Sequence, residues 1–244
     1  MTTRITGIGA GPGIVIGQVV IRRLLAAAVP VSGSVSPEVE RGRLASAVES
    51  TRGQLRDLAE TIAARAGVAE ANIFKAHLAL LDDPLLIGEI SGHIERECIS
   101  APQAVSRAAS NIAERFDALE DAYLRERAAD VRDLGQRLLQ NLSASSGLQA
   151  GTPEAGILVS RNVTPSETAL LDPQRILAVV TEEGSAAGHA AILARALNLV
   201  AVFGAKGILS EFKTQFDELL KEQVGIQELL HGKFMGVSVT NGLI

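Results

Sequence analysis

The sequence predicts a protein of mixed class, in which an α/β domain is interrupted by an inserted all-α, antiparallel helical bundle. Helical periodicity is confined to residues 38–142, whereas short runs rich in Val and Ile occur only on either side of it. Gly, Pro and Ser are enriched between the two patterns. At 244 residues, the chain is long enough for each part to bury a core. We expect an α/β domain of residues 1–30 and 148–244, and a helical domain of residues 31–147.

The first segment, "GIGAGPGIVIGQVVI", contains several glycines but no dinucleotide-binding fingerprint. A G-x-G-x-x-G pattern that starts at one of its first three glycines would need its last glycine at Pro12, Ile14 or Ile16. We therefore expect no cofactor site there. The segment predicts a glycine-rich turn that leads into a strand over residues 14–21, and "PVSGSVSP" (30–37) predicts a linker.

The central segment carries apolar residues at alternating steps of four and three, which is typical of long amphipathic helices. The apolar sets are Leu44, Val48, Thr51, Leu55, Leu58 and Ile62, then Val105, Ala109, Ile112, Phe116, Leu119 and Tyr123, and then Val131, Leu134, Leu138 and Leu142. The run Asp82-Asp83-Pro84 predicts a break between a helix that ends at Leu81 and the next helix. Four or more helices with short breaks indicate an antiparallel bundle.

Beyond a second linker (143–156), four short runs predict strands, with helices between them. The runs are 156–160, 175–181, 199–203 and 236–240. Thr164 and Glu167 form a capping box with proline at the first helical position, which predicts a helix start. A helical period also runs through Phe212, Phe216, Leu219 and Leu220.

Composition and charge exclude several classes of function. The net charge is −5 and both signs are mixed along the chain, so no basic stripe is available for nucleic acid or an anionic membrane. No run approaches the ~18 apolar residues of a membrane span. The single cysteine, Cys98, excludes an internal disulfide and a multi-cysteine metal site, which favours a reducing compartment. We expect a cytoplasmic protein that binds neither nucleic acid nor membrane.

The stretch "EEGSAAGHAAILAR" (182–195) places His189 at a glycine-marked turn ahead of an apolar helical run. There the imidazole would lie near unpaired N–H groups and the positive end of the helix dipole, which favour a phosphoryl group. A neutral imidazole is also a competent nucleophile, so acceptance of phosphoryl would be lost well below pH ~6.5. The alternative is a histidine that only hydrogen-bonds locally. A metal site is disfavoured, because no second ligand stands three or four residues away.

Residues 184–195, "GSAAGHAAILAR", resemble the phosphohistidine signature of PEP-utilising enzymes, and more of the chain resembles the N-terminal half of Enzyme I of the PEP:sugar phosphotransferase system. The supporting stretches occur in the family's order: "GIGAGPGIVIGQ" (7–18), "IFKAHLALLDDPLL" (73–86), "DAYLRERAADVRDLGQRLLQN" (121–141) and "VTPSETALL" (163–171). The resemblance implies a swivelling β/β/α phosphohistidine domain with an inserted helical subdomain. It also implies that phosphoryl passes from PEP, bound on a C-terminal barrel absent here, to the carrier protein HPr.

The resemblance assigns roles to particular residues. His189 would carry the phosphoryl group, Thr168 would hydrogen-bond the resting imidazole, and Arg195 completes the signature without an assigned role. No cofactor would bind this chain, and Mg²⁺ would be needed only with the PEP-binding barrel. The residues expected to contact HPr are His77, Leu80, Asp82, Asp83, Leu86 and Arg127.

Two departures from the family pattern stand near the histidine and at the chain end. Ser185 and Ala187 replace the usual residues of the signature, and hydroxyls often found beside the histidine are Gly188 and Ala190 here. Residues beyond Gly204 do not follow the family's short strand-rich closure. The alternatives are a pyruvate phosphate dikinase or PEP synthase domain, the Enzyme I-like part of a multiphosphoryl transfer or dihydroxyacetone-kinase phosphotransferase protein, and a non-catalytic bundle that only binds a partner.

Overall fold

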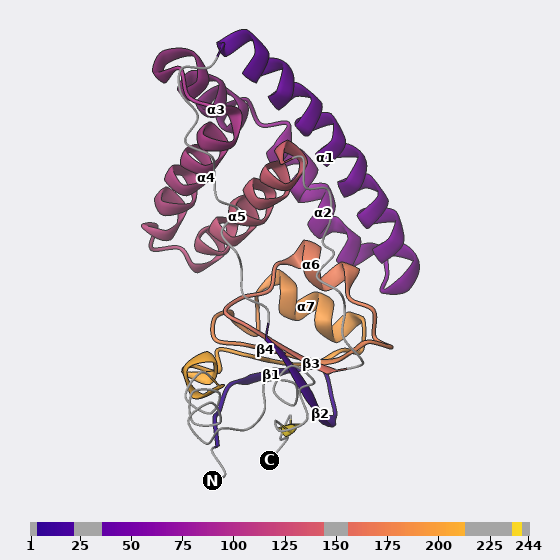
Figure 1. The fold of residues 1–244 in the computed structure, drawn as a ribbon. Coiled ribbons are helices and arrows are strands. Elements are labelled where there is room, and N and C mark those ends of the chain that lie inside the picture. The colour runs from indigo at the N-terminus through magenta and orange to yellow at the C-terminus, as the bar shows by residue number, and fades with distance from the viewer. Residues whose placement is uncertain (1–3, 22–35, 144–155, 213–235, 241–244) are drawn as a thin grey trace, which may run out of the picture. The chain divides into compact units, whose positions relative to one another are not determined.

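The computed structural model describes residues 4–21, 36–143, 156–212 and 236–240. The chain forms two compact units, one of Met1–Leu24 with Gly151–Ile244 and the other of Leu25–Ala150. The first is an α/β unit and the second is a bundle of helices (Figure 1), which confirms the predicted fold class. The predicted domain boundaries fall at residues outside the described ranges, so they stay predictions.

A six-stranded mixed sheet forms the α/β unit, in the order β1-β5-β4-β3-β2-β6. Strands β2 to β5 pair in parallel along this order, and β1 and β6 pair antiparallel at its two ends. Five of the strands lie where the sequence predicts them, and β1 is the exception. The bounds are β1 Ile8–Ala10, β2 Ile14–Ile21, β3 Gly156–Ser160, β4 Ile176–Thr181, β5 Val200–Phe203 and β6 Gly236–Thr240.

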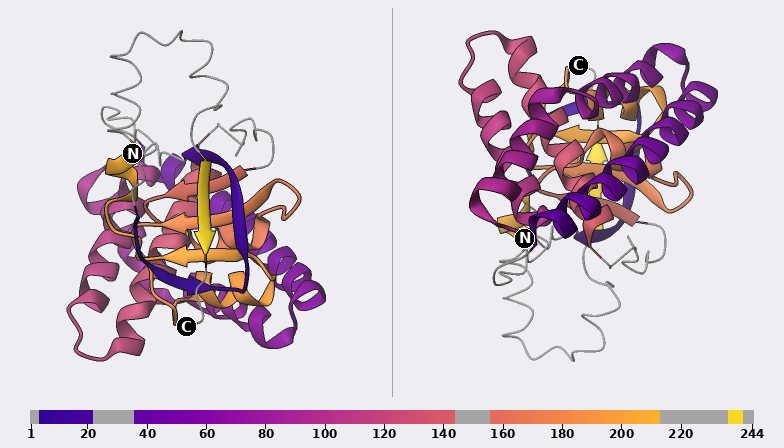
Figure 2. Two further views of the ribbon diagram at one scale, coloured as in Figure 1. Left: turned by 90° about the horizontal axis from the view of Figure 1, so that it is seen from below. Right: turned by 90° about the horizontal axis from the view of Figure 1, so that it is seen from above.

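The two halves of β2 pair with different strands. Residues 14–18 pair with β6, and residues 18–21 pair with the start of β3. The two paired stretches of β2 overlap only at Gln18. Figure 2 (left) shows β6 running across the direction of the central strands. The strand that precedes the helical insert thus lies beside β3, the first strand after it.

Successive side chains of a strand point to opposite faces of the sheet. Because the buried strands are almost entirely apolar, apolar side chains cover both faces. Helices α6 (Pro165–Leu170) and α7 (His189–Ala196) lie on one face (Figure 1). The core on that face includes Leu158, Val179, Ala191, Ala194, Ala201 and Phe203. The core on the other face includes Ile157, Val159, Val180, Ala205, Ile208 and Phe212.

Strand β1 lies within the segment that the sequence predicts to be a turn, so that prediction is wrong for residues 8–10. The three residues pair antiparallel with β5. Gly11 follows with φ +79°, and a Cβ there would lie 2.4 Å from the carbonyl oxygen of Leu199. A glycine is therefore required for the chain to pass so close to β5. The sequence signal for so short a strand is hidden by the glycines around it.

The helical unit contains five helices among residues 36–143. They are α1 Pro37–Arg65, α2 Val68–Leu81, α3 Pro84–Glu97, α4 Ala101–Asp117 and α5 Ala122–Leu142. The largest packing contacts join α4 to α5 and α1 to α2. The predicted break after Leu81 is confirmed, since the Asp83 side chain accepts the N–H of Leu85 at 2.8 Å and begins α3. Most of the predicted apolar sets are buried.

The second apolar set departs from the prediction at its end. Helix α4 ends at Asp117, and Leu119 is 40% exposed, so the helical period does not continue as a buried face. Asp121 accepts the N–H of Leu124 at 3.1 Å, which starts α5 on a new side-chain cap. The predicted helical period through Phe216, Leu219 and Leu220 lies outside the described residues. Within the described ranges, no helix combines the length and apolar character needed to cross a bilayer.

Candidate functional site

His189 is the first residue of α7, as the sequence predicts. Gly188 is the N-cap, with extended backbone angles of φ −61° and ψ 149°. The N–H groups of Ala191 and Ile192 both bond to the Gly188 carbonyl at 3.0 Å. The Ala190 N–H has no hydrogen-bond partner among the residues described. An unpaired amide at the positive end of a helix favours an anion beside the imidazole.

The loop of residues 184–188 between β4 and α7 has a fixed backbone at both ends. Gly184 has φ +108°, and a Cβ there would lie 2.9 Å from Cδ1 of the buried Phe203, so this position requires glycine. At the other end, the N–H of Gly188 donates to the hydroxyl of Ser185 at 2.9 Å and to its carbonyl at 3.3 Å. Ser185, one of the departures from the family signature, thus closes the turn before His189.

Arg195 contacts the middle of the same loop. Its Nη1 atom donates a hydrogen bond to the carbonyl oxygen of Ala186 at 2.8 Å. The arginine itself stands exposed in the last turn of α7. Sequence reasoning named this residue without a role, because the contact depends on the path of the loop and not on any periodicity.

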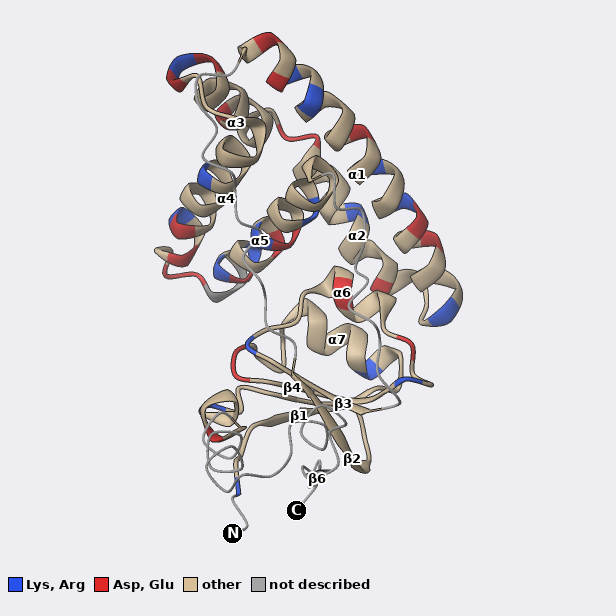
Figure 3. Cartoon of the chain, in the orientation of Figure 1, with Lys and Arg blue, Asp and Glu red and all other residues tan. Residues whose placement is uncertain are grey.

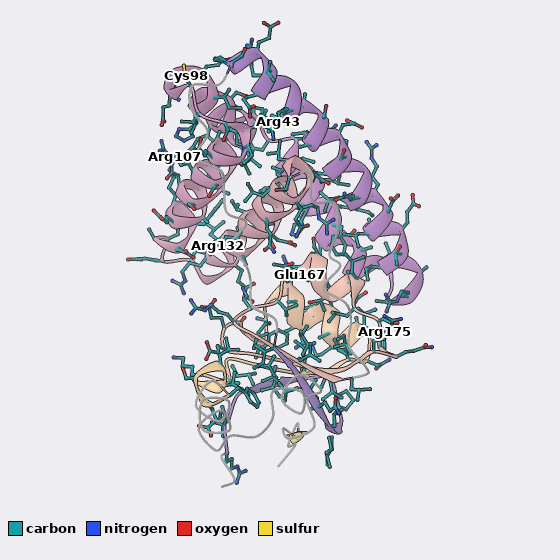
Figure 4. All side chains as sticks on the ribbon, viewed as in Figure 1. Arg43, Cys98, Arg107, Arg132, Glu167 and Arg175 are labelled. Atoms are coloured by element: carbon teal, nitrogen blue, oxygen red, sulfur yellow. The ribbon has the colours of Figure 1, made fainter. Side chains whose placement is uncertain are left out.

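Thr168 lies on α6, which packs against α7. The predicted capping box is present: the Glu167 N–H donates to Thr164 Oγ1 at 3.2 Å, and the Thr164 N–H donates to the Glu167 carboxylate at 2.9 Å. Figure 4 marks Glu167 on this helix. The Thr168 hydroxyl donates to the Thr164 carbonyl at 2.9 Å. Since a hydroxyl has one proton, Thr168 can serve an imidazole only as an acceptor of a ring N–H.

The two glutamates before the loop, Glu182 and Glu183, have different surroundings. The Glu182 carboxylate accepts the N–H of Leu209 at 3.1 Å, and Leu209 packs on the sheet face opposite the one that carries Ala190. Glu183 is exposed, and its backbone is held by Thr181, whose hydroxyl donates to the Glu183 carbonyl at 2.5 Å. Glu182 therefore stabilises the backbone on the far face of the sheet.

The residues predicted to bind a carrier differ in exposure within the helical unit. Asp82 and Asp83 are exposed, although Asp82 accepts a hydrogen bond from Arg52 at 2.8 Å, which raises the pKa of that arginine. His77 and Leu86 are buried, with 1% and 5% exposure, and Leu80 is partly buried. The docking role of these residues stays a prediction.

Sequence reasoning missed a buried polar cluster around His77. The imidazole Nε2 lies 3.2 Å from Asp130, and Nδ1 lies 3.7 Å from Asp133, with both carboxylates coming from α5. Arg127, another predicted docking residue, lies 3.5 Å from Asp130. The rings of His77 and Phe74 also pack in a T-shaped arrangement, with a centroid distance of 5.9 Å. The signal was present in "RAADVRD", where two aspartates stand three apart beside buried apolar positions.

A shallow groove of about 530 Å³ lies between α3 and α4. Leu85, which is 61% exposed, and Pro84 stand at one end of it, directly beside the predicted docking residues in the sequence. Glu89 lies along the groove and accepts hydrogen bonds from Asn111 at 3.2 Å and from Arg115 at 3.1 Å.

Comparisons with known proteins match both units. The family model "PEP-utilising enzyme, N-terminal" matches residues 6–127, and "PEP-utilising enzyme, mobile domain" matches residues 152–220. Phosphoenolpyruvate-protein phosphotransferase of Priestia megaterium is 31% identical over 217 residues, which are 87% of this chain and 37% of that protein. The enzyme of the same name from Geobacillus stearothermophilus is 33% identical over 213 residues, 86% of this chain and 36% of that protein.

Two solved structures have the same fold. The solution structure of Enzyme I (nEIt) is 31% identical with a TM-score of 0.59, and the match covers 85% of each chain. The N-terminal domain of "Enzyme 1 - Nitrogen" is 34% identical with a TM-score of 0.60, over 82% of this chain and 83% of that one. The chain spans little more than a third of the length of the curated relatives. It belongs to the Enzyme I family of PEP-utilising enzymes and corresponds to the N-terminal region of those proteins.

Proposed function

We propose that His189 accepts a phosphoryl group and passes it on, and that the protein exchanging phosphoryl with it is an HPr-like histidine carrier. The observation that carries this proposal is the place of His189 as first residue of α7, after a loop of small residues and beside the amide of Ala190, which has no partner in the described part of the chain. Small neighbours leave room for a second protein to bring its own histidine close. The named activity of the Enzyme I relatives is a phosphotransferase.

The proposed reaction is an in-line transfer between two imidazoles. A new N–P bond forms on His189 as the N–P bond on the carrier's phosphohistidine breaks, and the carrier's ring nitrogen leaves with the bonding electron pair. Phosphoryl transfers of this kind have a loose transition state, so alignment and electrostatic stabilisation of the equatorial oxygens dominate catalysis. The Ala190 amide and the positive end of α7 would stabilise those oxygens.

Thr168 would fix the imidazole before transfer. Because its proton is donated to the Thr164 carbonyl, its oxygen can accept the N–H of one ring nitrogen. The other ring nitrogen would then be unprotonated, which is the state that can attack phosphorus. Gly188 and Ala190 lack the hydroxyls that often stand beside the histidine in the family. Hydrogen bonds to the phosphoryl oxygens would therefore come from backbone amides and from the nearby Ser185.

The carrier would dock on the helical unit. Asp82 and Asp83 supply exposed negative charge, which suits a basic partner surface, and the groove that begins at Pro84 and Leu85 supplies an adjacent recess. PEP would bind a separate C-terminal domain, which would also hold Mg²⁺. For the exchange with a carrier we propose that no metal is required.

The experiment uses the chain and HPr carrying ³²P on its histidine. The chain should acquire phosphate that is labile in acid and stable in base, and His189→Ala should acquire none. His231→Ala is the matched control, since His231 belongs to none of the motifs and is not a proposed docking residue, and it should be labelled like the parent. A parent chain that stays unlabelled would refute the proposal. Unlabelled but carrier-bound protein would instead support a purely binding module.

A further inference from the structure

The loop of residues 184–188 consists of glycine, alanine and serine, and such a sequence has many backbone conformations of similar energy. Phosphoryl transfer, in contrast, requires the acceptor and its stabilising amides to be held within about 0.5 Å of the productive geometry. The loop leads directly into His189 and α7. Contacts that hold the loop therefore decide how well the imidazole and the Ala190 amide are placed.

Side chains hold the loop at two points. Ser185 closes its second half through the 2.9 Å bond from the Gly188 N–H. Arg195 holds its centre through the 2.8 Å bond to the Ala186 carbonyl. The arginine stands on a rigid base, because α7 buries Ala191, Leu193 and Ala194 in the core. A cationic donor makes a stronger bond to a carbonyl than a neutral donor does.

We propose that Arg195 is a positioning residue for His189: from the last turn of α7, its guanidinium clamps the Ala186 carbonyl and fixes the loop that enters the same helix. This inference rests on the proposed phosphoryl transfer at His189. Arg195 stands six residues after the histidine and acts through Ala186, not on the reacting atoms. The clamp ties the loop before α7 to the far end of the same helix, so His189 lies between two joined points.

A positive charge near the end of a helix also stabilises the helix dipole, whatever it contacts. The two roles predict different behaviour for the conservative variant. Arg195→Lys keeps the charge but loses the planar fork, so a clamp is only partly restored while a dipole effect is fully kept. Arg195→Met removes both. Arg175→Met is the matched control, because Arg175 is an exposed arginine of the same unit outside the loop and α7.

The first measurement is hydrogen exchange of the amides of residues 184–190, with the amides of β3 and β4 as an internal reference for folding. We expect exchange in the loop to be about tenfold faster in Arg195→Met, intermediate in Arg195→Lys and unchanged in Arg175→Met, while the strands keep their protection. The second measurement is phosphoryl acceptance from ³²P-labelled HPr. We expect kcat to fall about tenfold in Arg195→Met, with KM for HPr unchanged, because docking involves the helical unit.

Loop exchange at the parent rate in Arg195→Met overturns the inference, whether or not the parent chain accepts phosphoryl. If the parent is never labelled, the proposed function fails, and the exchange measurement still decides whether the clamp exists. Should Arg195→Met lose protection in β3 and β4 as well, Arg195→Lys decides: intermediate loop exchange with protected strands supports the clamp, and parent-like exchange overturns it.

Discussion

The helical unit and the α/β unit are each stabilised by a different kind of contact. In the helical unit, charged side chains link different helices, as in the pairs Arg41–Glu95 at 3.0 Å and Arg115–Glu89 at 3.1 Å. Figure 3 shows basic and acidic residues along these helices, whereas the strands of the α/β unit carry none. In the α/β unit, close backbone approaches at glycines set the fold. Helical glycines with open space around them, such as Gly53, should therefore tolerate substitution, whereas Gly184 in the loop before His189 should not.

Gly184→Ala tests the requirement for glycine in the α/β unit and should have the largest effect on stability. The added Cβ would meet Phe203 at 2.9 Å in a backbone conformation, φ +108°, that side chains rarely adopt. We expect the α/β unit to lose about 2–4 kcal/mol of unfolding free energy. Urea unfolding, followed by hydrogen exchange of β4 and β5, measures the loss. A change below about 0.5 kcal/mol would contradict the requirement for glycine.

The same substitution in the bundle supplies the contrast. Gly53 lies within α1, and a Cβ there would have no atom within 4 Å. Because alanine is the better helix former, Gly53→Ala should stabilise the helical unit by about 0.5–1 kcal/mol. Changes of opposite sign in the unfolding free energy of Gly184→Ala and Gly53→Ala would support the comparison, and changes of equal sign would contradict it.

Glu40→Ala tests the polar links of the bundle and should have the second largest effect. The buried carboxylate accepts the N–H of Ala101, the first residue of α4, at 2.6 Å and also binds Arg43 at 2.9 Å. Its loss leaves a buried N–H without its acceptor, so we expect a cost of about 1–3 kcal/mol in urea unfolding followed by circular dichroism. Glu38→Ala, at an exposed position of the same helical turn, should change stability by less than about 0.5 kcal/mol.

Glu97→Gln tests an exposed link and should have the smallest effect. The hydrogen bond from His93, 2.6 Å long, lowers the pKa of Glu97, and Arg107 adds to this. A lowered folded-state pKa means that the carboxylate stabilises the fold above its ordinary pKa of 4.5, and that this contribution is lost as pH falls through the lowered value. The Tm of the variant should lie about 1 °C below the parent at pH 7 and match it near pH 2. A constant difference across this range would argue against the link.

Much of the fold could be predicted because local signals agree with the tertiary structure. The Val-rich and Ile-rich runs become β3 to β5 almost residue for residue, and the Thr164 capping box starts α6. The signals failed where context decides. Strand β1 is three residues among glycines and exists only through its pairing with β5. The apolar period at Leu119 continues in the sequence after α4 has ended.

The candidate site was predictable in type but not in its supporting contacts. The helix start at His189 follows from glycine before an apolar run. The bond from Arg195 to Ala186 could not be predicted, since it depends on a loop conformation that no periodicity encodes. The orientation of Glu182 toward Leu209 likewise depends on which face of the sheet residue 209 occupies.

The divided pairing of β2 sets an order of assembly. Gln18 pairs with both Gly156 and Gly236, which the ribosome makes long after it. The helices of residues 37–142 are contiguous, so they can form while the first strands still wait for partners. The turn that presents His189 is anchored on β4 and β5. These strands become part of a complete sheet only when β6 has been translated. A nascent chain would thus form its helical bundle before the α/β unit that carries His189 is complete.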